Sequence, residues 1–324
     1  MNNILDIANL AGVSKSTVSR YLNGGSVSDK TRQKIDKIVQ ETGYAPNQFA
    51  QSLKAKRTNM IGVIVPRLNS FASNETLLGI ETYLRKQNYQ TLIANTDLSN
   101  ELELSAIKTF HKSKVDGIIL LATEVTTAHI ELIKSIKKPF LLVGQQHDQI
   151  HSIIQNDFEA GIAMGQYFRN LEFNNIAYLG VPEIDIAVGK KRKQGVMQGY
   201  AKPIDMFETT FKLQDATDAA YNLVKQYKAI ICATDNIALG VLKAAQQQGI
   251  NVPQALSITG FGGYETTSIV TPMITTIRFP YFQTGELAAL SMIELIDEKE
   301  VPRLQEMTFI LDEKESVDKN QIQA

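Results

Sequence analysis

The chain has 324 residues, of which 44% are hydrophobic and 21% charged, a composition that excludes a disordered protein and allows two or three cores. Its single cysteine, Cys232, excludes an internal disulfide and any metal site built from several cysteines. The formal net charge of -1 hides an asymmetry: residues 1–57 carry nine Lys or Arg against four acids, whereas the rest carries 24 against 30.

The sequence shows no export signal and no membrane span. Its N-terminus lacks a basic region followed by an apolar run, and no apolar stretch approaches ~20 residues. We therefore expect a cytoplasmic protein without a membrane partner.

Three short helices are predicted at the N-terminus. Apolar residues at helical spacing indicate a helix over 4–11, Gly12 supplies a tight turn, and a second helix runs over 15–23. A third helix over 28–42 ends at Gly43, a favourable C-cap. This order of helices and turns is the helix-turn-helix arrangement.

The second predicted helix has a face suited to a partner. Val18, Tyr21 and Leu22 share its apolar side, whereas Ser16 and Arg20 point the opposite way. A solvated helix normally carries long charged residues outward, but this one offers short hydroxyls and one Arg. Together with the basic excess of the segment, this face favours nucleic-acid contact over a merely solvated surface.

From Asn59 onward, short apolar runs alternate with amphipathic stretches. The runs are MIGVIVP, QTLIAN, DGIILLA, PFLLVG, NIAYLG, AIICAT and LSITGF. They predict buried parallel strands, each followed by a helix, in a doubly wound α/β body. Ligands bind such sheets beyond the carboxyl ends of the strands, where this chain places Arg67, Gln145, Asp235 and Tyr264.

The order and spacing of several stretches resemble the LacI/GalR family of bacterial transcription repressors. The stretches are DIANLAGVSKSTVSRYLNG, GYAPNQFAQSL, IGVIVPRLNSFA, VDGIIL, RKQG, ATDNIALGVLKAAQQQGINVPQALSITGF and ITTIRFP. The resemblance implies a helix-turn-helix domain over 1–46, a hinge helix over 47–58, and a two-lobed α/β core over 59–324 similar to periplasmic sugar-binding proteins. It also implies a homodimer on a pseudo-palindromic operator; dimer and tetramer both stay open.

The resemblance divides the core into two lobes. The N-lobe is expected over about 59–157 and 281–299, and the C-lobe over about 158–277 and 304–320.

Operator contacts are expected from both N-terminal segments. The resemblance places some side chains against bases of the major groove, others near phosphates, and the hinge residues in the minor groove, where an apolar side chain can unstack a base step. The residues are Lys15, Ser16, Thr17, Arg20, Asn23, Asn47, Ala50 and Leu53.

A small-molecule effector, a sugar or sugar phosphate, is expected between the lobes. Its expected contacts are Arg67, Asn69, Phe71, Gln145, Arg192, Asp235, Tyr264 and Phe279, although the two Phe residues could equally belong to the core. Gly262 stands where many relatives carry an acid, and two Arg come from different lobes, so we expect a phosphorylated sugar. The effector could act as inducer or as corepressor.

Two other functions fit the sequence less well. A sugar-binding transport protein shares the core but would need a signal peptide and no DNA-binding segment. An α/β enzyme with a nucleotide cofactor would need GxGxxG after the first strand or GxxxxGK[ST], and neither occurs. The four His show no spacing for a nucleophile or a metal, so no catalytic residue, metal or cofactor is expected.

Overall fold

The computed structural model describes residues 3–22, 25–44 and 57–319. The chain divides into two compact units, Met1–Thr58 and Asn59–Ala324, each of which is described by itself. In the described residues, no helix is long and apolar enough to cross a membrane.

The first unit contains the three helices that the sequence predicts. They are α1 (Ile4–Ala11), α2 (Lys15–Leu22) and α3 (Asp29–Thr42). Their apolar faces meet in a small core that buries Ile7, Val18 and Ile35 completely. Each helix is too short to be stable alone in water, so this shared core holds them together.

Local capping fixes where these helices start and stop. Asn3 forms a capping box with Asp6 at the start of α1, and Ser28 accepts the backbone N–H of Thr31 at the start of α3. Gly12 and Gly43 end these two helices in the left-handed conformation, with φ of 64° and 59°. That conformation favours glycine because it has no Cβ.

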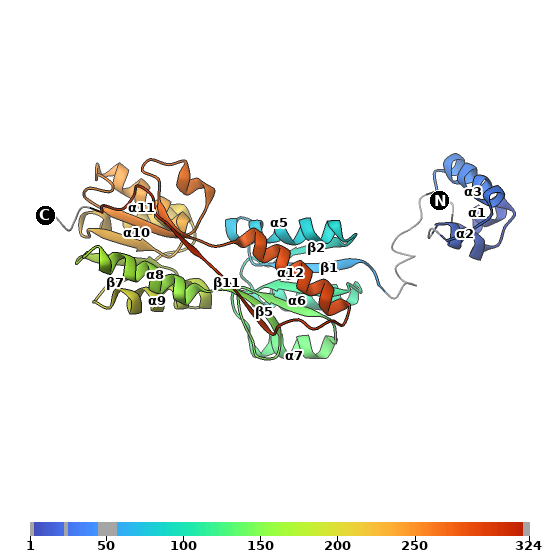
Figure 1. Cartoon of the computed structure of the whole chain (residues 1–324), viewed down its shortest axis with the longest axis horizontal. Coiled ribbons are helices and arrows are strands. Elements are labelled where there is room, and N and C mark those ends of the chain that lie inside the picture. The colour runs from blue at the N-terminus through green and yellow to red at the C-terminus, as the bar shows by residue number, and fades with distance from the viewer. Residues whose placement is uncertain (1–2, 23–24, 45–56, 320–324) are drawn as a thin grey trace. The chain divides into compact units, whose positions relative to one another are not determined.

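The second unit contains two sheets, each with helices on both sides (Figure 1). The first sheet has the order β11-β5-β4-β3-β1-β2, and every pairing in it is parallel. Its strands are β1 (Met60–Val65), β2 (Gln90–Asn95), β3 (Gly117–Leu121), β4 (Phe140–Val143), β5 (His151–Gln155) and β11 (Leu304–Met307).

Two pairs of helices cover the first sheet. Val63 packs with α5 (Phe71–Lys86) and α12 (Tyr281–Ile296), whereas the next residue, Ile64, packs with α6 (Asn100–Lys112) and α7 (Thr127–Ile136). Consecutive side chains of a strand point to opposite faces, so a strand covered on both sides is apolar throughout.

The second sheet has the order β12-β10-β9-β8-β6-β7 and is parallel except for the pair β10–β12. Its strands are β6 (Ile176–Gly180), β7 (Asp205–Glu208), β8 (Ala229–Cys232), β9 (Ser257–Gly262), β10 (Thr275–Arg278) and β12 (Ile310–Asp312). Its helices are α8 (Asp157–Asn170), the π-helix η1 (Ile186–Lys191), α9 (Arg192–Tyr200), α10 (Leu213–Ala220) and α11 (Asp235–Gln247), with short 3-10 turns η2 (Leu223–Lys225) and η3 (Glu265–Ser268).

The chain passes between the two sheets at three places in the described residues: from β5 to α8, from β10 to α12, and from β11 to β12. The last passage corrects the expectation for residues 304–320. We expected them in the C-lobe, but β11 pairs in parallel with β5 of the first sheet, and only the residues after it join the second. The alternating exposure of β11, an edge strand, gave no apolar run to place it.

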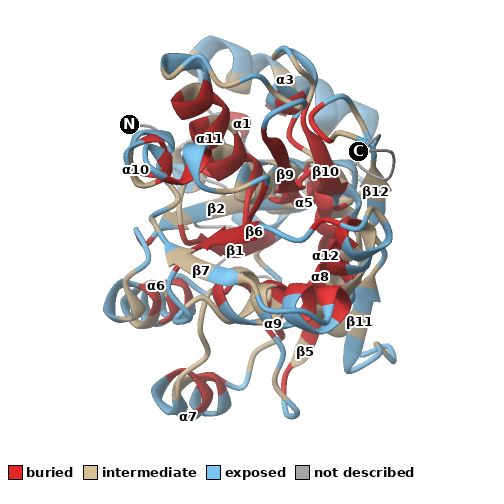
Figure 2. Ribbon diagram, turned by 90° about the vertical axis from the view of Figure 1, so that its left-hand side faces the viewer, coloured by how far each residue is buried: buried red, intermediate tan, exposed pale blue. Residues whose placement is uncertain are grey.

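All seven predicted strands form, but the runs did not reveal five others, β5, β7, β10, β11 and β12. The prediction that all seven are buried is wrong for β2, an edge strand on which Ile93 is half exposed. Figure 2 shows the contrast, with β1, β6, β9 and β10 buried and the edge strands β2 and β7 partly exposed.

Candidate functional site

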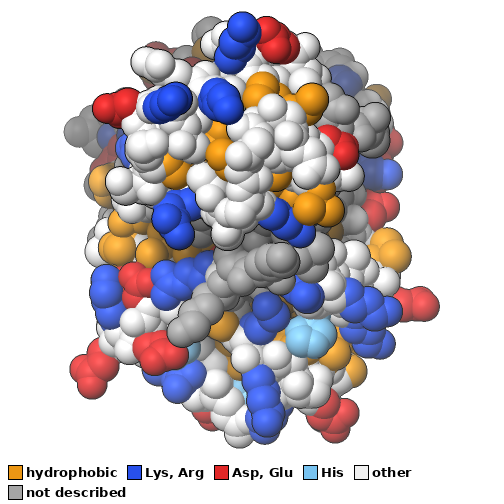
Figure 3. Space-filling model, turned by 90° about the vertical axis from the view of Figure 1, so that its right-hand side faces the viewer, with side chains coloured by type: hydrophobic (Ala, Val, Ile, Leu, Met, Phe, Trp, Pro, Cys, Tyr) orange, Lys and Arg blue, Asp and Glu red, His pale blue; other side chains and the backbone are white. Residues whose placement is uncertain are grey.

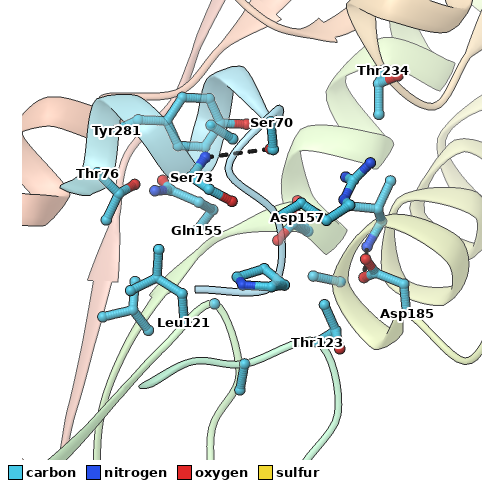
Figure 4. Close-up of a pocket in the computed structure, with 18 of the residues that line it drawn as sticks. Ser70, Ser73, Thr76, Leu121, Thr123, Gln155, Asp157, Asp185, Thr234 and Tyr281 are labelled. Carbon is cyan, nitrogen blue, oxygen red and sulfur yellow. Dashed lines mark hydrogen bonds between the residues drawn. The ribbon is translucent and has the colours of Figure 1, made fainter. Parts of the chain in front are cut away.

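A cavity lies between the two lobes of the second unit. It encloses about 820 Å³ of empty space, part of it open to solvent. Both sheets contribute through the loops at the carboxyl ends of their strands, as expected for parallel sheets. In Figure 4, Ser73, Thr76, Gln155 and Tyr281 lie on one side of the cavity, and Asp157, Asp185 and Thr234 on the other.

The lining combines hydroxyl and amide groups with aromatic rings and four charged side chains. The hydroxyl and amide groups come from Ser70, Ser73, Thr76, Thr123, Thr234, Gln145 and Gln155; the aromatic rings from Phe211, Tyr264 and Tyr281; the charges from Arg67, Arg192, Asp157 and Asp185. A concave site with apolar walls and several orienting polar groups is typical of a small-molecule site.

Arg192, the first residue of α9, is held from several sides. Its Nε donates to Oδ1 of Asp157 at 2.6 Å, and its Nη1 donates to the carbonyl oxygen of Ala233 at 2.8 Å. The guanidinium also lies 4.9 Å from the ring centre of Phe279 and 5.4 Å from that of Phe261. Burial lowers the pKa of Arg192, but the Asp157 carboxylate together with Tyr281 and Tyr264 raises it above its ordinary value, so the group stays charged.

The helix pair α8 and α9 sets the position of this ion pair. Asp157 and Arg192 are the first residues of the two helices. The helices approach so closely that a Cβ on Gly161 would collide with the carbonyl oxygen of Arg192, and one on Gly195 with that of Phe158. Glycine at these crossing points therefore allows the two helix starts to meet.

Arg67, in the loop after β1, reaches across to the other lobe. Its guanidinium carbon lies 4.1 Å from the ring centre of Phe211. Its Nε is buried and has no hydrogen-bond partner among the described residues, and burial lowers its pKa. A buried donor without an acceptor is costly, so this nitrogen is suited to a ligand oxygen.

Gln155, at the end of β5, has a buried acceptor without a partner among the described residues. Its Nε2 donates to Oγ1 of Thr284 at 2.8 Å, whereas its Oε1 is buried without a partner in the described part of the chain. The cavity wall thus offers an unpaired acceptor as well as an unpaired donor.

Asp185 caps the π-helix that precedes Arg192. One carboxylate oxygen accepts the backbone N–H of Val188 at 2.9 Å. Burial raises the pKa of Asp185, while this hydrogen bond and the charge of Arg192 act in the opposite direction. The residue therefore brings a partly buried carboxyl group to the cavity wall.

Four of the eight residues expected to contact an effector line the cavity: Arg67, Gln145, Arg192 and Tyr264. The other four, Asn69, Phe71, Asp235 and Phe279, are not among the lining residues.

Three of those four support lining residues. Phe71 packs on Tyr264, with ring centres 4.5 Å apart, and Phe279 lies against Arg192. Asp235 is completely buried and accepts the backbone N–H of Tyr264 at 2.7 Å and the hydroxyl of Thr276 at 2.6 Å. Asn69 is exposed.

Sequence reasoning missed Gln155, Asp185 and Phe211 as lining residues. Asp185 follows the predicted strand NIAYLG by five residues, so the strand-end argument could have found it. Gln155 ends β5 and Phe211 follows β7, and neither of these short strands has a pronounced apolar run.

In the first unit, the outer face of α2 carries the predicted contact residues. Lys15, Ser16 and Arg20 are exposed, and Thr17 is half-buried. The hydroxyl of Ser14 lies 2.7 Å from that of Ser16 and 2.8 Å from that of Thr17, so these groups form a local network. Val18 fills the core on the opposite side.

Basic side chains are frequent on the exposed surface of this unit. Besides those of α2, they come from Lys30, Arg32, Lys34 and Lys37 of α3. Figure 3 shows Lys and Arg side chains in blue over one face of the molecule. The expected DNA contacts Asn23, Asn47, Ala50 and Leu53 lie outside the described residues.

Comparison with known proteins decides the family. Residues 3–47 match the model of bacterial regulatory proteins, lacI family, and residues 166–317 match a periplasmic binding protein-like domain. The sucrose operon repressor of Staphylococcus xylosus is 45% identical over 98% of this chain and 99% of its own length. Catabolite control protein A of Priestia megaterium is 30% identical over 92% of this chain and 93% of its own. The chain belongs to the lacI family of bacterial regulatory proteins.

The fold agrees with this membership. The structure of a lac repressor dimer bound to operator and an anti-inducer superposes with a TM-score of 0.88 at 24% identity, covering 97% of this chain and 98% of that one. The residues matched by the lacI model contain α1, α2 and α3. This LacI-family protein is therefore a DNA-binding transcriptional regulator with a ligand-binding core, and not an enzyme.

Proposed function

We propose that this regulator represses a sugar-utilisation operon and that a sugar bound in the cavity between the lobes controls its affinity for the operator. The cavity is the main observation in support of this proposal, since both lobes line it. It presents an unpaired buried donor on Arg67 and an unpaired buried acceptor on Gln155. A sugar hydroxyl both donates and accepts, so one ligand type satisfies both groups. The resemblance to a sucrose operon repressor makes sucrose the first sugar to test.

A ligand in this cavity can influence the DNA because it touches both lobes. The lobes are joined by the three strand-to-strand and strand-to-helix passages, and contacts such as Arg67 on Phe211 and Phe71 on Tyr264 cross between them. A ligand that binds one lobe arrangement more tightly shifts the population toward it. The free energy of this shift equals the difference between the ligand's binding free energies for the two lobe arrangements, which is typically about 1 to 3 kcal/mol for coupled sites.

The exposed face of α2 supports a proposal for the DNA-binding residues. We propose that Lys15, Ser16 and Arg20 read base edges in the major groove and that Thr17 contacts a phosphate; Asn23, Asn47, Ala50 and Leu53 complete the proposed set. The domain boundaries belong to the same proposal, with the helix-turn-helix domain over 1–46 and the hinge over 47–58. A homodimer would present two such helices to the halves of a pseudo-palindrome.

Calorimetric titration of the full chain with sucrose, with and without operator DNA, tests the proposal. We expect binding in both titrations with different affinities, because a coupled ligand distinguishes the DNA-bound state from the free one. Phe211→Ala should weaken sucrose binding by about tenfold, since the ring lines the cavity and stacks on Arg67. The control Tyr221→Ala removes an exposed ring outside the cavity lining and should change nothing.

Equal sucrose affinity with and without the operator would contradict the coupling. Absence of sucrose binding, in a protein that still binds its operator, would remove sucrose as the effector.

A further inference from the structure

The charges on the cavity wall balance each other. Arg67 and Arg192 contribute two positive charges, and Asp157 and Asp185 contribute two negative ones. The charge of Arg192 is engaged by Asp157 at 2.6 Å inside the protein. With both aspartates ionised, the four charges cancel, so the two arginines give this cavity no positive excess to attract a phosphate ester.

The unpaired and charged acceptors also favour a ligand that donates hydrogen bonds. Oε1 of Gln155 is a buried acceptor without a partner among the described residues, and the Asp185 carboxylate lines the same cavity. A phosphate ester replaces one hydroxyl donor of the sugar by a group that, when fully ionised, offers only acceptor oxygens. Acceptor facing acceptor leaves a buried polar group unsatisfied, which disfavours binding.

The Asp185 carboxylate already accepts a backbone N–H that could otherwise donate to an anionic ligand. It accepts the N–H of Val188 at the first turn after β6, and the neighbouring Arg192 already donates through Nε and Nη1. An incoming phosphate would meet a fixed carboxylate in a partly desolvated site, where like charges repel strongly.

We infer that the cavity selects an uncharged polyhydroxylated sugar over its phosphate ester, and that Asp185 is the side chain responsible for this choice. The inference rests on the proposed sugar-binding function. It reverses the expectation of a phosphorylated effector, which considered the two arginines without the two carboxylates that accompany them.

Calorimetric titration of the full chain with sucrose and with sucrose 6-phosphate tests the inference. Wild type should bind sucrose at least about tenfold more tightly than the phosphate ester. Asp185→Asn keeps an oxygen for the N–H of Val188 but removes the charge. It should therefore relieve the repulsion of the phosphate and narrow the preference for sucrose over sucrose 6-phosphate by about tenfold.

The matched control is Asp218→Asn, which removes an exposed carboxylate of α10 outside the cavity lining and should leave the preference unchanged. Thermal unfolding followed by circular dichroism verifies that each variant is folded. Tighter binding of the phosphate ester by wild type would overturn the inference while leaving the sugar-binding proposal intact. An unchanged preference in Asp185→Asn would overturn the role of Asp185. If neither sugar binds, the proposed function is wrong and this inference is wrong with it.

Discussion

Arg192 and Asp157 form a buried ion pair that joins the starts of two helices, although 35 residues separate them in the chain. The side chains of both are at most 5% exposed. Because the N–H of Nε and one N–H of Nη1 of Arg192 are engaged by protein oxygens, a ligand in the cavity is left with the second N–H of Nη1 and the two of Nη2. The pair thus fixes which edge of the guanidinium faces the cavity.

Asp157→Ala should destabilise the protein strongly. It leaves the Arg192 charge buried without its carboxylate partner, a change that typically costs about 3 to 5 kcal/mol in the free energy of unfolding. Urea unfolding followed by circular dichroism measures the loss.

The control for this prediction is Glu41→Ala, which breaks the exposed pair between Lys37 and Glu41. Such pairs contribute roughly 0 to 1 kcal/mol, so the urea midpoint should hardly move. Similar effects of the two substitutions would mean that the buried pair is not what stabilises the helix starts.

Gly199→Ala should loosen the contact between α8 and α9. A Cβ at this position would collide with the backbone carbonyl of Ile162, and a backbone group cannot rotate away as a flexible side chain does. Overpacking of this kind costs about 1 to 3 kcal/mol. Because α9 begins at Arg192, the shift should also weaken effector binding, measured by titration with sucrose.

Gln198→Ala is the matched control, since it changes the neighbouring, exposed residue of the same helix. Its effect on unfolding should stay within about 0.5 kcal/mol. A Gly199→Ala protein as stable as this control would show that α8 and α9 can move apart without loss of stability.

The parts of the fold that depend on residues close together in the chain could be predicted from the sequence. The helices of the first unit follow from caps such as Ser28 and Gly43, and the buried strands from continuous apolar runs. Strand β5, HSIIQ, begins with polar residues and was missed, although it is buried in the sheet.

The cavity could be predicted only in part, because its decisive contacts are distant in the sequence. Arg67 and Arg192 were recognised from strand ends and from resemblance. The partner of Arg192 lies 35 residues away, and Asp185 precedes a π-helix that no periodicity revealed. The sequence therefore shows which charges are present but not which are paired, and the expectation of an anionic effector considered Arg67 and Arg192 without Asp157 and Asp185.

Arg20→Ala should relax the choice of operator sequence. Its side chain is exposed on α2, and an Arg can pair bidentately with guanine. We expect a loss of about 1 to 3 kcal/mol for the cognate operator and reduced discrimination at one position of each half-site. Fluorescence anisotropy with a set of single-base operator variants measures both.

Lys37→Ala provides the comparison for Arg20→Ala, because it removes an exposed positive charge from α3 of the same unit. It should preserve the ranking of operator variants, even if all affinities decline slightly through the lost charge. An Arg20→Ala protein that keeps the wild-type ranking would contradict base recognition by Arg20.

The buried carboxylate of Asp235 should make stability depend on pH below neutrality. Burial raises its pKa to about 6, against the lowering effect of hydrogen bonds from Thr276 and the backbone of Tyr264. In the unfolded chain the pKa of Asp is about 3.9, so between these two values the folded state binds the proton more tightly.

The stabilisation from the protonated Asp235 is therefore fully present below about pH 4 and is lost as the pH rises through about 6. A difference of about two pKa units corresponds to roughly 3 kcal/mol in the free energy of unfolding. Asp235→Asn does not titrate, so the stability of wild type relative to this variant should fall by that order across the interval. Urea unfolding of both proteins at a series of pH values measures the difference. A pH-independent difference would show that the carboxylate is ionised with an ordinary pKa in the folded protein.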